Sequence, residues 1–412
     1  MFKIILGLIT AVVASLHATP AQAAQKANET DATTSATYVL STPAKAQKAV
    51  VTGAERTSEY LKLLKGKRVA LFSNQTGVVG NKHVLDVLLE NKVNVVTIFS
   101  PEHGFRGKAD AGEKVSSSVD EKTGVNIYSL YGVKGGAPDD AEMQKFDVLV
   151  SDIQDVGLRF YTYYITMERL MDRCAEYGKK MIVLDRPNPL GGLKVEGNLA
   201  EDDCLSFVSA FKIPYVYGLT PGEVALLLNG ENMLGKKCDL EVVKMKGWKR
   251  KMTYEQTGLQ WVLPSPHIPQ PVSAPFYSVS GIVGELDSIS IGVGYTLPFQ
   301  MFGAPWIKAP ELAQRLNALN LPGVMFRPMY YKPFYAFGKG EELQGVQVYL
   351  TDYEKAKLTS IQFYVLQELY SLYPDHDVLA KCTKRHDMFD KVCGSKQIRQ
   401  LFMKRHKWED VQ

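Results

Sequence analysis

The chain has 412 residues with 48 basic and 44 acidic side chains, which gives a formal net charge of +4. This near balance argues against a protein dedicated to binding nucleic acid, because such domains carry a strong positive excess. The five cysteines are scattered along the sequence and odd in number, so they indicate no disulfide framework.

Residues 1–24 have the features of a secretory signal peptide. Lys3 precedes an apolar run over residues 4–16, and residues 21–24 provide the small side chains of an A-x-A cleavage site. No stretch of about 18 apolar residues follows, so we expect no membrane span and predict an exported, periplasmic or secreted protein. Residues 25–57 are rich in small and polar side chains and predict a flexible tether ahead of the fold.

Short apolar runs then alternate with segments that can form helices, which is typical of a parallel sheet with crossover helices. The predicted strands are 68–73, 93–100, 126–130, 148–151, 181–184 and 240–243. The clearest predicted helices are 84–90, 167–177 and one that begins at a capping box formed by Thr220 and Glu223. We therefore predict an α/β fold with a Rossmann-like parallel sheet domain over residues 58–262.

A cluster of five prolines marks the end of this domain. They lie between residues 264 and 275, where neither a helix nor a central strand would tolerate so many. Beyond them, β-like runs at 289–293 and 345–350 mix with helical patterns at 310–319 and 359–372. Residues 263–412 therefore predict a second, smaller auxiliary domain of the α+β class.

Polar loops follow four of the predicted parallel strands. In an open α/β sheet such loops meet at the carboxyl edge and form the ligand crevice. The side chains expected to gather there are Asn74, Gln75, Glu102, His103, Asp152, Gln154, Asp155, Arg159, Asp185, Arg186 and Asn188. The histidines lack H-x-x-x-H spacing and the first loop lacks G-x-G-x-x-G, so we predict no metal site and no dinucleotide cofactor.

Glu102, in the run SPEHGF at residues 100–105, is the first candidate for chemistry. Glycoside cleavage needs a proton donor at the leaving oxygen, and a glutamate is suited to that task. On this motif alone, Glu102 could equally cap the following helix or pair with Arg106. His103 lies beside it, and either Asp152 or Glu196 could supply a second acid.

Two arginines in these loops could bind an acidic substrate. Arg159 is suited to gripping a carboxylate bidentately, although it could instead pair with Asp152 or Asp155. Arg186 precedes two prolines that flank Asn188, so both side chains would be presented on a stiff segment, or would form only a rigid turn.

An aromatic run follows at residues 160–164. Tyr163 in this run could stack on a sugar ring, although some of these rings must belong to the core.

Many ordered motifs then resemble one family. They include LKGKRVALFSNQTG, FSPEHGFRG, DVLVSDIQDVGLRFYTY, VLDRPNPLGG and YGLTPGE, and the sequence is similar to the DUF1343 family of NamZ-type exo-β-N-acetylmuramidases from about residue 61 onward. The resemblance implies an exported enzyme that removes N-acetylmuramic acid from the non-reducing ends of peptidoglycan fragments, in a cleft between a Rossmann-like and an auxiliary domain.

The same resemblance implies roles for particular residues. The family's catalytic glutamate maps onto Glu102, and the lactyl carboxylate of muramic acid would give Arg106, Arg159 or Arg186 a partner. A second catalytic carboxylate and attack by the substrate's own 2-acetamido group remain alternatives.

This chain departs from the family's pattern in its second domain. It has SPHIP at residues 265–269 and GVGYTLPF at residues 292–299, where the family usually has SPNMP and GRGT-RPF. If these segments line the cleft, the sugar subsite there is altered. Two alternatives to the muramidase are a periplasmic binding protein for cell-wall sugars that lacks turnover, and a hydrolase or transferase for another acidic small molecule.

Overall fold

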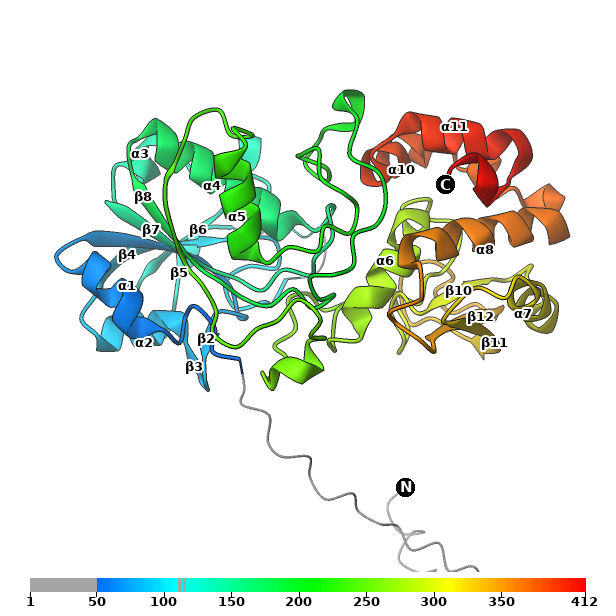
Figure 1. Ribbon diagram of the computed structural model, residues 1–412, viewed down its shortest axis with the longest axis horizontal. Coiled ribbons are helices and arrows are strands. Elements are labelled where there is room, and N and C mark those ends of the chain that lie inside the picture. The colour runs from blue at the N-terminus through cyan, green and yellow to red at the C-terminus, as the bar shows by residue number, and fades with distance from the viewer. Residues whose placement is uncertain (1–49, 110–112, 114–115) are drawn as a thin grey trace, which may run out of the picture. The chain divides into compact units, whose positions relative to one another are not determined.

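A seven-stranded sheet lies at the centre of the N-terminal half (Figure 1). The computed structural model describes residues 50–109, 113 and 116–412, so the predicted signal peptide and residues 25–49 of the predicted tether lie outside the described residues. The strand order is β5-β6-β4-β1-β7-β8-β9, and every neighbouring pair is parallel except β5 with β6. The strands are β1 Arg68–Ser73, β4 Asn94–Ser100, β5 Ser118–Val119, β6 Asn126–Ser129, β7 Val148–Asp152, β8 Lys180–Leu184 and β9 Asp239–Val243.

Helices cover both faces of this sheet, as Figure 1 shows. On one face α1 (Thr57–Leu64) and α2 (Val84–Glu90) bury Tyr60, Leu64 and Leu88 against the strands. The other face is covered by α3 (Asp140–Met143), α4 (Thr162–Glu176) and α5 (Pro221–Gly230). Burial on both faces explains why the central strands read as continuous apolar runs. The predicted Rossmann-like α/β fold is confirmed.

The strand order creates a switch point at β1. The chain leaves β1 for β4 on one side and later returns to the opposite side of β1 with β7. The loops that follow these three strands therefore diverge at one place on the carboxyl edge, which is where open α/β sheets bind ligands. Asn74 follows β1, Glu102 follows β4, and Gln154 follows β7.

The C-terminal half contains a three-stranded antiparallel sheet and several helices. The sheet has the order β10-β12-β11, with β10 Met301–Ala304, β11 Val324–Tyr331 and β12 Leu343–Leu350. The helices are α6 Ser273–Gly284, α7 Ala309–Ala318, α8 Leu358–Leu372, α9 Val378–Lys381, α10 His386–Cys393 and α11 Lys396–Arg405. A small hairpin of β2 (Val78–Val79) and β3 (Lys82–His83) belongs to the N-terminal half.

Two predictions for this half were wrong. Residues 289–293 do not form a strand, since Ser290 makes only a single bridge to Gly303. The proline cluster was expected to contain no helix, but its last proline, Pro275, lies in the first turn of α6, which begins at Ser273. A proline is tolerated there because the first N–H groups of a helix have no intrahelical acceptor.

The two halves share one apolar core. Phe160, which precedes α4, stacks on Tyr215 with ring centroids 5.4 Å apart and contacts Tyr277 of α6 at 4.5 Å. The same cluster continues to Phe363 in α8. The chain therefore has no gap in its core near residue 263, where the sequence predicted a boundary. Among the described helices, none combines the length and the apolar character that a membrane crossing requires.

Residues 50–57 were predicted to be part of the tether, and this was wrong. The Val50 N–H donates to the carbonyl of Thr257 at 2.8 Å, and the Gly53 N–H donates to Asp185 O at 2.9 Å. Ala54 is fully buried, and a Cβ at Gly53 would lie 2.3 Å from the carbonyl oxygen of Val243. The segment lacks large apolar side chains because it packs by close backbone approach, which composition does not reveal.

This contact predicts a sharp limit for N-terminal truncation. A chain that begins at Ser58 loses these backbone hydrogen bonds and the burial of Ala54, so its free energy of unfolding should fall by about 3–5 kcal/mol relative to a chain that begins at Val50. Urea denaturation of the two chains measures the difference. Equal midpoints and slopes would contradict the packed role of residues 50–57.

Candidate active site

Glu102 lies in the turn that follows β4, at the switch point of the sheet. Its Oε2 accepts a hydrogen bond of 3.2 Å from the hydroxyl of Thr162, the first residue of α4. The pKa of Tyr131 is raised, mainly by burial and to a smaller extent by the charge of Glu102 and a hydrogen bond to its carboxyl group. Two hydroxyls from separate loops therefore orient the carboxyl group, and the positive end of the α4 dipole lies beside it.

Aromatic side chains surround this carboxyl group. Burial raises the pKa of Tyr163 and that of Tyr277, and the charge of Glu102 adds to both shifts. The Tyr161 ring lies 4.7 Å from that of Tyr163, and the Tyr277 ring lies 4.2 Å from Phe299. Glu102 itself is half-buried, so its carboxyl group lies between these rings and solvent.

His103 has a positioning role in this turn. It has a positive φ of 70°, which is uncommon for a residue other than glycine, and it is buried. Its Nδ1 lies 2.9 Å from the carbonyl oxygen of Ala109, to which it donates. The imidazole therefore fixes the backbone path next to Glu102.

Asp152 and Arg186 form a buried bidentate ion pair. Arg186 donates from Nε to Asp152 Oδ1 at 2.6 Å and from Nη2 to Oδ2 at 2.8 Å. The same Nη2 also donates to the carbonyl of Val78 at 2.8 Å. Each side chain thus has a structural partner in the fold, while the roles of Asp152 as a second acid and of Arg186 as a substrate contact stay predictions.

Arg159, which was predicted to bind substrate, contacts backbone groups in this structure. Its guanidinium is fully buried and donates to the carbonyls of Asn198, Ile213 and Cys393. Burial lowers its pKa. The acceptors are backbone groups from both halves of the chain. These hydrogen bonds therefore include neither of the alternative partners, Asp152 and Asp155.

The side chain of Glu196, from the loop after β8, caps the N-terminus of α8. Its Oε2 accepts a hydrogen bond of 2.9 Å from the N–H of Thr359, and its Oε1 lies 3.5 Å from Lys194 Nζ. A carboxylate at a helix N-terminus satisfies an otherwise unpaired N–H and interacts favourably with the dipole. This contact gives Glu196 a structural role at the helix end, while its catalytic role stays a prediction.

Three further predicted contacts support the loops instead of facing a ligand. Gln154 donates to the carbonyls of Asp155 and Pro187 at 2.8 and 2.7 Å, and Asn188 donates to Leu219 O at 2.9 Å. Arg106 makes a bidentate pair with Asp120, with both nitrogen to oxygen distances at 3.0 Å. Gln154 and Asn188 thus bond backbone carbonyls and Arg106 a carboxylate of the same chain, and their roles as substrate contacts stay predictions.

Asp155 holds the turn that precedes α4. It accepts hydrogen bonds from the Gly157 N–H at 2.8 Å, from the Tyr164 N–H at 3.2 Å and from the Tyr217 hydroxyl at 2.5 Å. Complete burial raises its pKa to about 6, although these donors act in the opposite direction. Asp155 therefore has a structural role in this turn.

Asn74 and Gln75 lie next to the Glu102 group. Asn74 adjoins the Tyr163 hydroxyl, where it lowers the pKa of Tyr163 against the effect of burial. Gln75 donates to the carbonyls of Leu263 and Pro264 at 2.9 and 3.2 Å, and Tyr163 donates to the same carbonyl of Pro264 at 2.5 Å. Tyr163 was predicted to stack on a sugar, but its ring is buried and its hydroxyl instead holds the proline-rich segment beside the site.

The residues missed by the sequence analysis are Tyr131, Thr162 and Tyr277. Thr162 stands within the aromatic run and signalled nothing by itself, because its role depends on the start of α4, which was predicted five residues too late. Tyr277 lies on α6, a helix the sequence did not predict. The only signal for Tyr131 was its position directly after a predicted strand.

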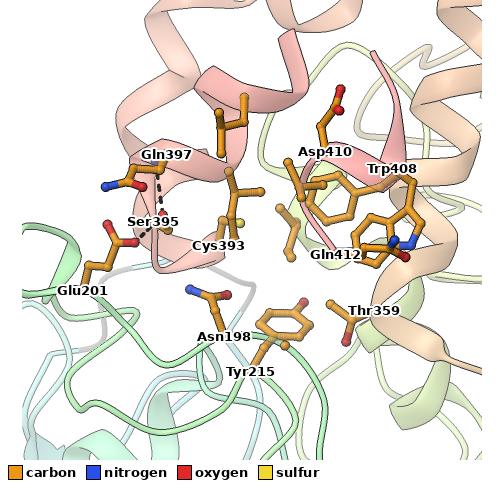
Figure 2. A pocket seen from close by; sticks show the side chains of 16 residues that line it. Asn198, Glu201, Tyr215, Thr359, Cys393, Ser395, Gln397, Trp408, Asp410 and Gln412 are labelled. Atoms are coloured by element: carbon orange, nitrogen blue, oxygen red, sulfur yellow. Dashed lines mark hydrogen bonds between the residues drawn. The ribbon is translucent and has the colours of Figure 1, made fainter. Parts of the chain in front are cut away.

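A separate cavity of about 590 Å³ lies between the loop after β8 and the C-terminal helices (Figure 2). Asn198 and Tyr215 from the N-terminal half face Thr359, Cys393 and Trp408 across it. None of the twelve predicted site residues lines this cavity. The site around Glu102 is therefore a different place in the fold.

The contrast between the two arginines yields a stability prediction. Arg159→Met leaves several buried carbonyls without a donor, so the free energy of unfolding should fall by about 3–5 kcal/mol. Arg106→Met removes a partly exposed pair and should cost about 1 kcal/mol or less. Urea denaturation measures both, and an equal loss in the two variants would contradict the scaffold role of Arg159.

Comparisons with known proteins match both halves of the chain. The model of the exo-β-N-acetylmuramidase NamZ N-terminal domain matches residues 69–272, and that of the NamZ C-terminal domain matches residues 276–412. The chain is 44% identical over 344 residues to the peptidoglycan β-N-acetylmuramidase NamZ of Bacillus subtilis, covering 83% of this chain and 81% of the relative.

Two crystal structures of DUF1343 proteins from Bacteroides fragilis are similar to the described fold. One is 56% identical with a TM-score of 0.85 and covers 88% of this chain and 94% of its own; the other is 36% identical with a TM-score of 0.69 and covers 88% and 95%. Since both family domains match in order and together span most of the chain, the protein belongs to the NamZ family of exo-β-N-acetylmuramidases.

Proposed function

We propose that the protein hydrolyses the bond of a non-reducing terminal N-acetylmuramic acid in peptidoglycan fragments, with Glu102 as the proton donor. Membership of the family makes it a glycoside hydrolase of the exo-β-N-acetylmuramidase type. The observation that carries the assignment of Glu102 is its place: it lies half-buried at the switch point and accepts a hydrogen bond from Thr162 at the start of α4.

The surroundings of Glu102 suit the delivery of one proton. The hydroxyl of Thr162 fixes the direction of the carboxyl group, and Tyr131 approaches it from the loop after β6. With Glu102 protonated, its proton passes to the glycosidic oxygen as the bond to the anomeric carbon breaks, and the leaving group departs as an alcohol.

We propose that the second catalytic group belongs to the substrate. The two other carboxylates considered, Asp152 and Glu196, are bound to Arg186 and to the N-terminus of α8. The 2-acetamido oxygen of the sugar would attack the anomeric carbon and close a ring. Water then opens this ring at the anomeric carbon and returns a proton to the Glu102 carboxylate, so the enzyme ends unchanged.

We also propose that the protein acts outside the cytoplasm, in the periplasm or as a secreted protein. The support for this location is the signal-like sequence of residues 1–24. Peptidoglycan fragments are accessible there, so the location fits the substrate.

Replacement of Glu102 tests the assignment. Glu102→Gln keeps the shape of the side chain but removes the transferable proton, so kcat on a chromogenic N-acetylmuramide should fall by about 10²–10⁴-fold with a nearly unchanged KM. Glu121→Gln, a matched change at an exposed position, should keep wild-type rates.

We expect the wild-type protein to release the chromophore from the muramide and to release little from the corresponding N-acetylglucosaminide. Full activity of Glu102→Gln would overturn the assignment. Tight binding of the muramide without release by the wild-type protein would instead favour a binding protein for cell-wall sugars.

The role of the acetamido group has its own test. Replacing the N-acetyl group of the chromogenic substrate by mono-, di- and trifluoroacetyl groups withdraws electrons from the attacking oxygen. We expect kcat/KM to fall stepwise with each fluorine, whereas a nucleophile supplied by the protein would leave it nearly constant. Steady-state rates across the series decide between the two.

A further inference from the structure

The two segments that depart from the family's sequence pattern both contact the loop that carries Phe334 and Tyr335. His267, from the SPHIP segment, stacks on Tyr335 with ring centroids 5.9 Å apart and planes at 26°. Gly294, from the GVGYTLPF segment, accepts a 2.7 Å hydrogen bond from the Phe334 N–H through its carbonyl oxygen. In that segment Tyr295 stacks on Phe334 at 5.8 Å and 22°.

The backbone fit at Gly294 shows that this contact is specific. Gly294 has a φ of +87°, and a Cβ there would lie 1.9 Å from the carbonyl oxygen of Tyr335. Only glycine combines that backbone angle with so close an approach. The loop that carries Phe334 and Tyr335 is therefore held in place from beneath.

His267, Tyr295, Phe334 and Tyr335 together form a surface that we call the aromatic platform. Phe334 is 67% exposed and Tyr335 is 48% exposed, so both present ring surface to solvent. Single exposed apolar residues are common and need no explanation, but a group of stacked, exposed rings on a backbone-braced loop is typical of a binding surface.

One end of the platform is connected to the Glu102 group through the SPHIP segment. Pro264, three residues before His267, accepts the hydrogen bond from Tyr163, which follows Thr162, the residue that donates to Glu102. Three residues of extended chain span no more than about 11 Å. The SPHIP segment therefore runs from the Tyr163 contact to the platform within that distance.

A second connection runs through the GVGYTLPF segment. Phe299, four residues after Tyr295, packs on Tyr277 with ring centroids 4.2 Å apart. The Tyr277 ring also lies 6.4 Å from that of Tyr161, the residue before Thr162. The segment thus reaches from the platform to the rim of the site, and four residues bridge at most about 14 Å.

We propose that the aromatic platform binds the sugars on the leaving-group side of the scissile bond, beginning with N-acetylglucosamine. This proposal rests on the proposed function. An enzyme that removes a terminal sugar has a single unit on the non-reducing side, so every further sugar of the substrate extends on the leaving-group side. Aromatic faces pack well against the C–H faces of pyranose rings and against an N-acetyl methyl group.

A pair of substrates isolates the platform's contribution. The β-fluoride of N-acetylmuramic acid has a leaving group of one atom, whereas a MurNAc–GlcNAc glycan of two to four sugars extends over the proposed surface. In the Phe334→Ala and Tyr335→Ala variants, the ratio of kcat/KM on the glycan to kcat/KM on the fluoride should fall about tenfold per ring. Tyr330→Ala, an exposed tyrosine of β11 outside the platform, should leave this ratio unchanged.

Binding gives a readout that does not need turnover. In a Glu102→Gln background, titration calorimetry should show Kd for the MurNAc–GlcNAc glycan rising about tenfold in Phe334→Ala, while Kd for N-acetylmuramic acid alone stays constant. An unchanged ratio together with an unchanged glycan Kd would overturn the platform even if the muramide is hydrolysed. A third outcome separates the two proposals. If the wild-type protein binds the glycan without hydrolysing muramides, and Phe334→Ala loses that binding, the platform is supported and only the proposed function is refuted.

Discussion

The buried ion pair between Asp152 and Arg186 organises the edge of the sheet on which the site is built. Asp152 ends β7 and Arg186 follows β8, so their two hydrogen bonds join the ends of neighbouring strands. The carbonyl of Asp152 also accepts from the Ser73 hydroxyl at the end of β1. A buried pair of this geometry is costly to break, because either partner alone would be an unpaired charge in the interior. Three loops are thereby fixed before any substrate arrives.

On that rigid edge, reactivity and support are divided between different residues. Glu102 comes from the β4 loop, and its hydroxyl neighbours come from the β6 loop and the start of α4. The arginines that would match an acidic sugar in charge, Arg159 and Arg186, are buried in the scaffold. Among the rings near Glu102, Tyr163 is buried and its hydroxyl holds the proline-rich segment, so it supports the site from within the core.

The sequence predicted the sheet and the position of Glu102 well, because both depend on local signals. Apolar periodicity located the strands, and the order of strands placed the loops at one edge. The contacts of polar loop residues could not be predicted in the same way. Arg159 donates to the carbonyls of Asn198 and Cys393, and the Glu196 carboxylate accepts from the first turn of α8. The roles of both side chains therefore depend on partners that are distant in the sequence.

The core shared by the two halves constrains how this family can vary. Since Phe160, Tyr215 and Tyr277 pack as one group across the predicted boundary, a recombination between relatives near residue 263 would cut through matched side chains. Arg159 adds a second constraint, because its acceptors include the end of α10. Exposed loops such as the one carrying Phe334 and Tyr335 escape both constraints. Substrate preference can therefore diversify at these loops, while the two halves must be inherited together.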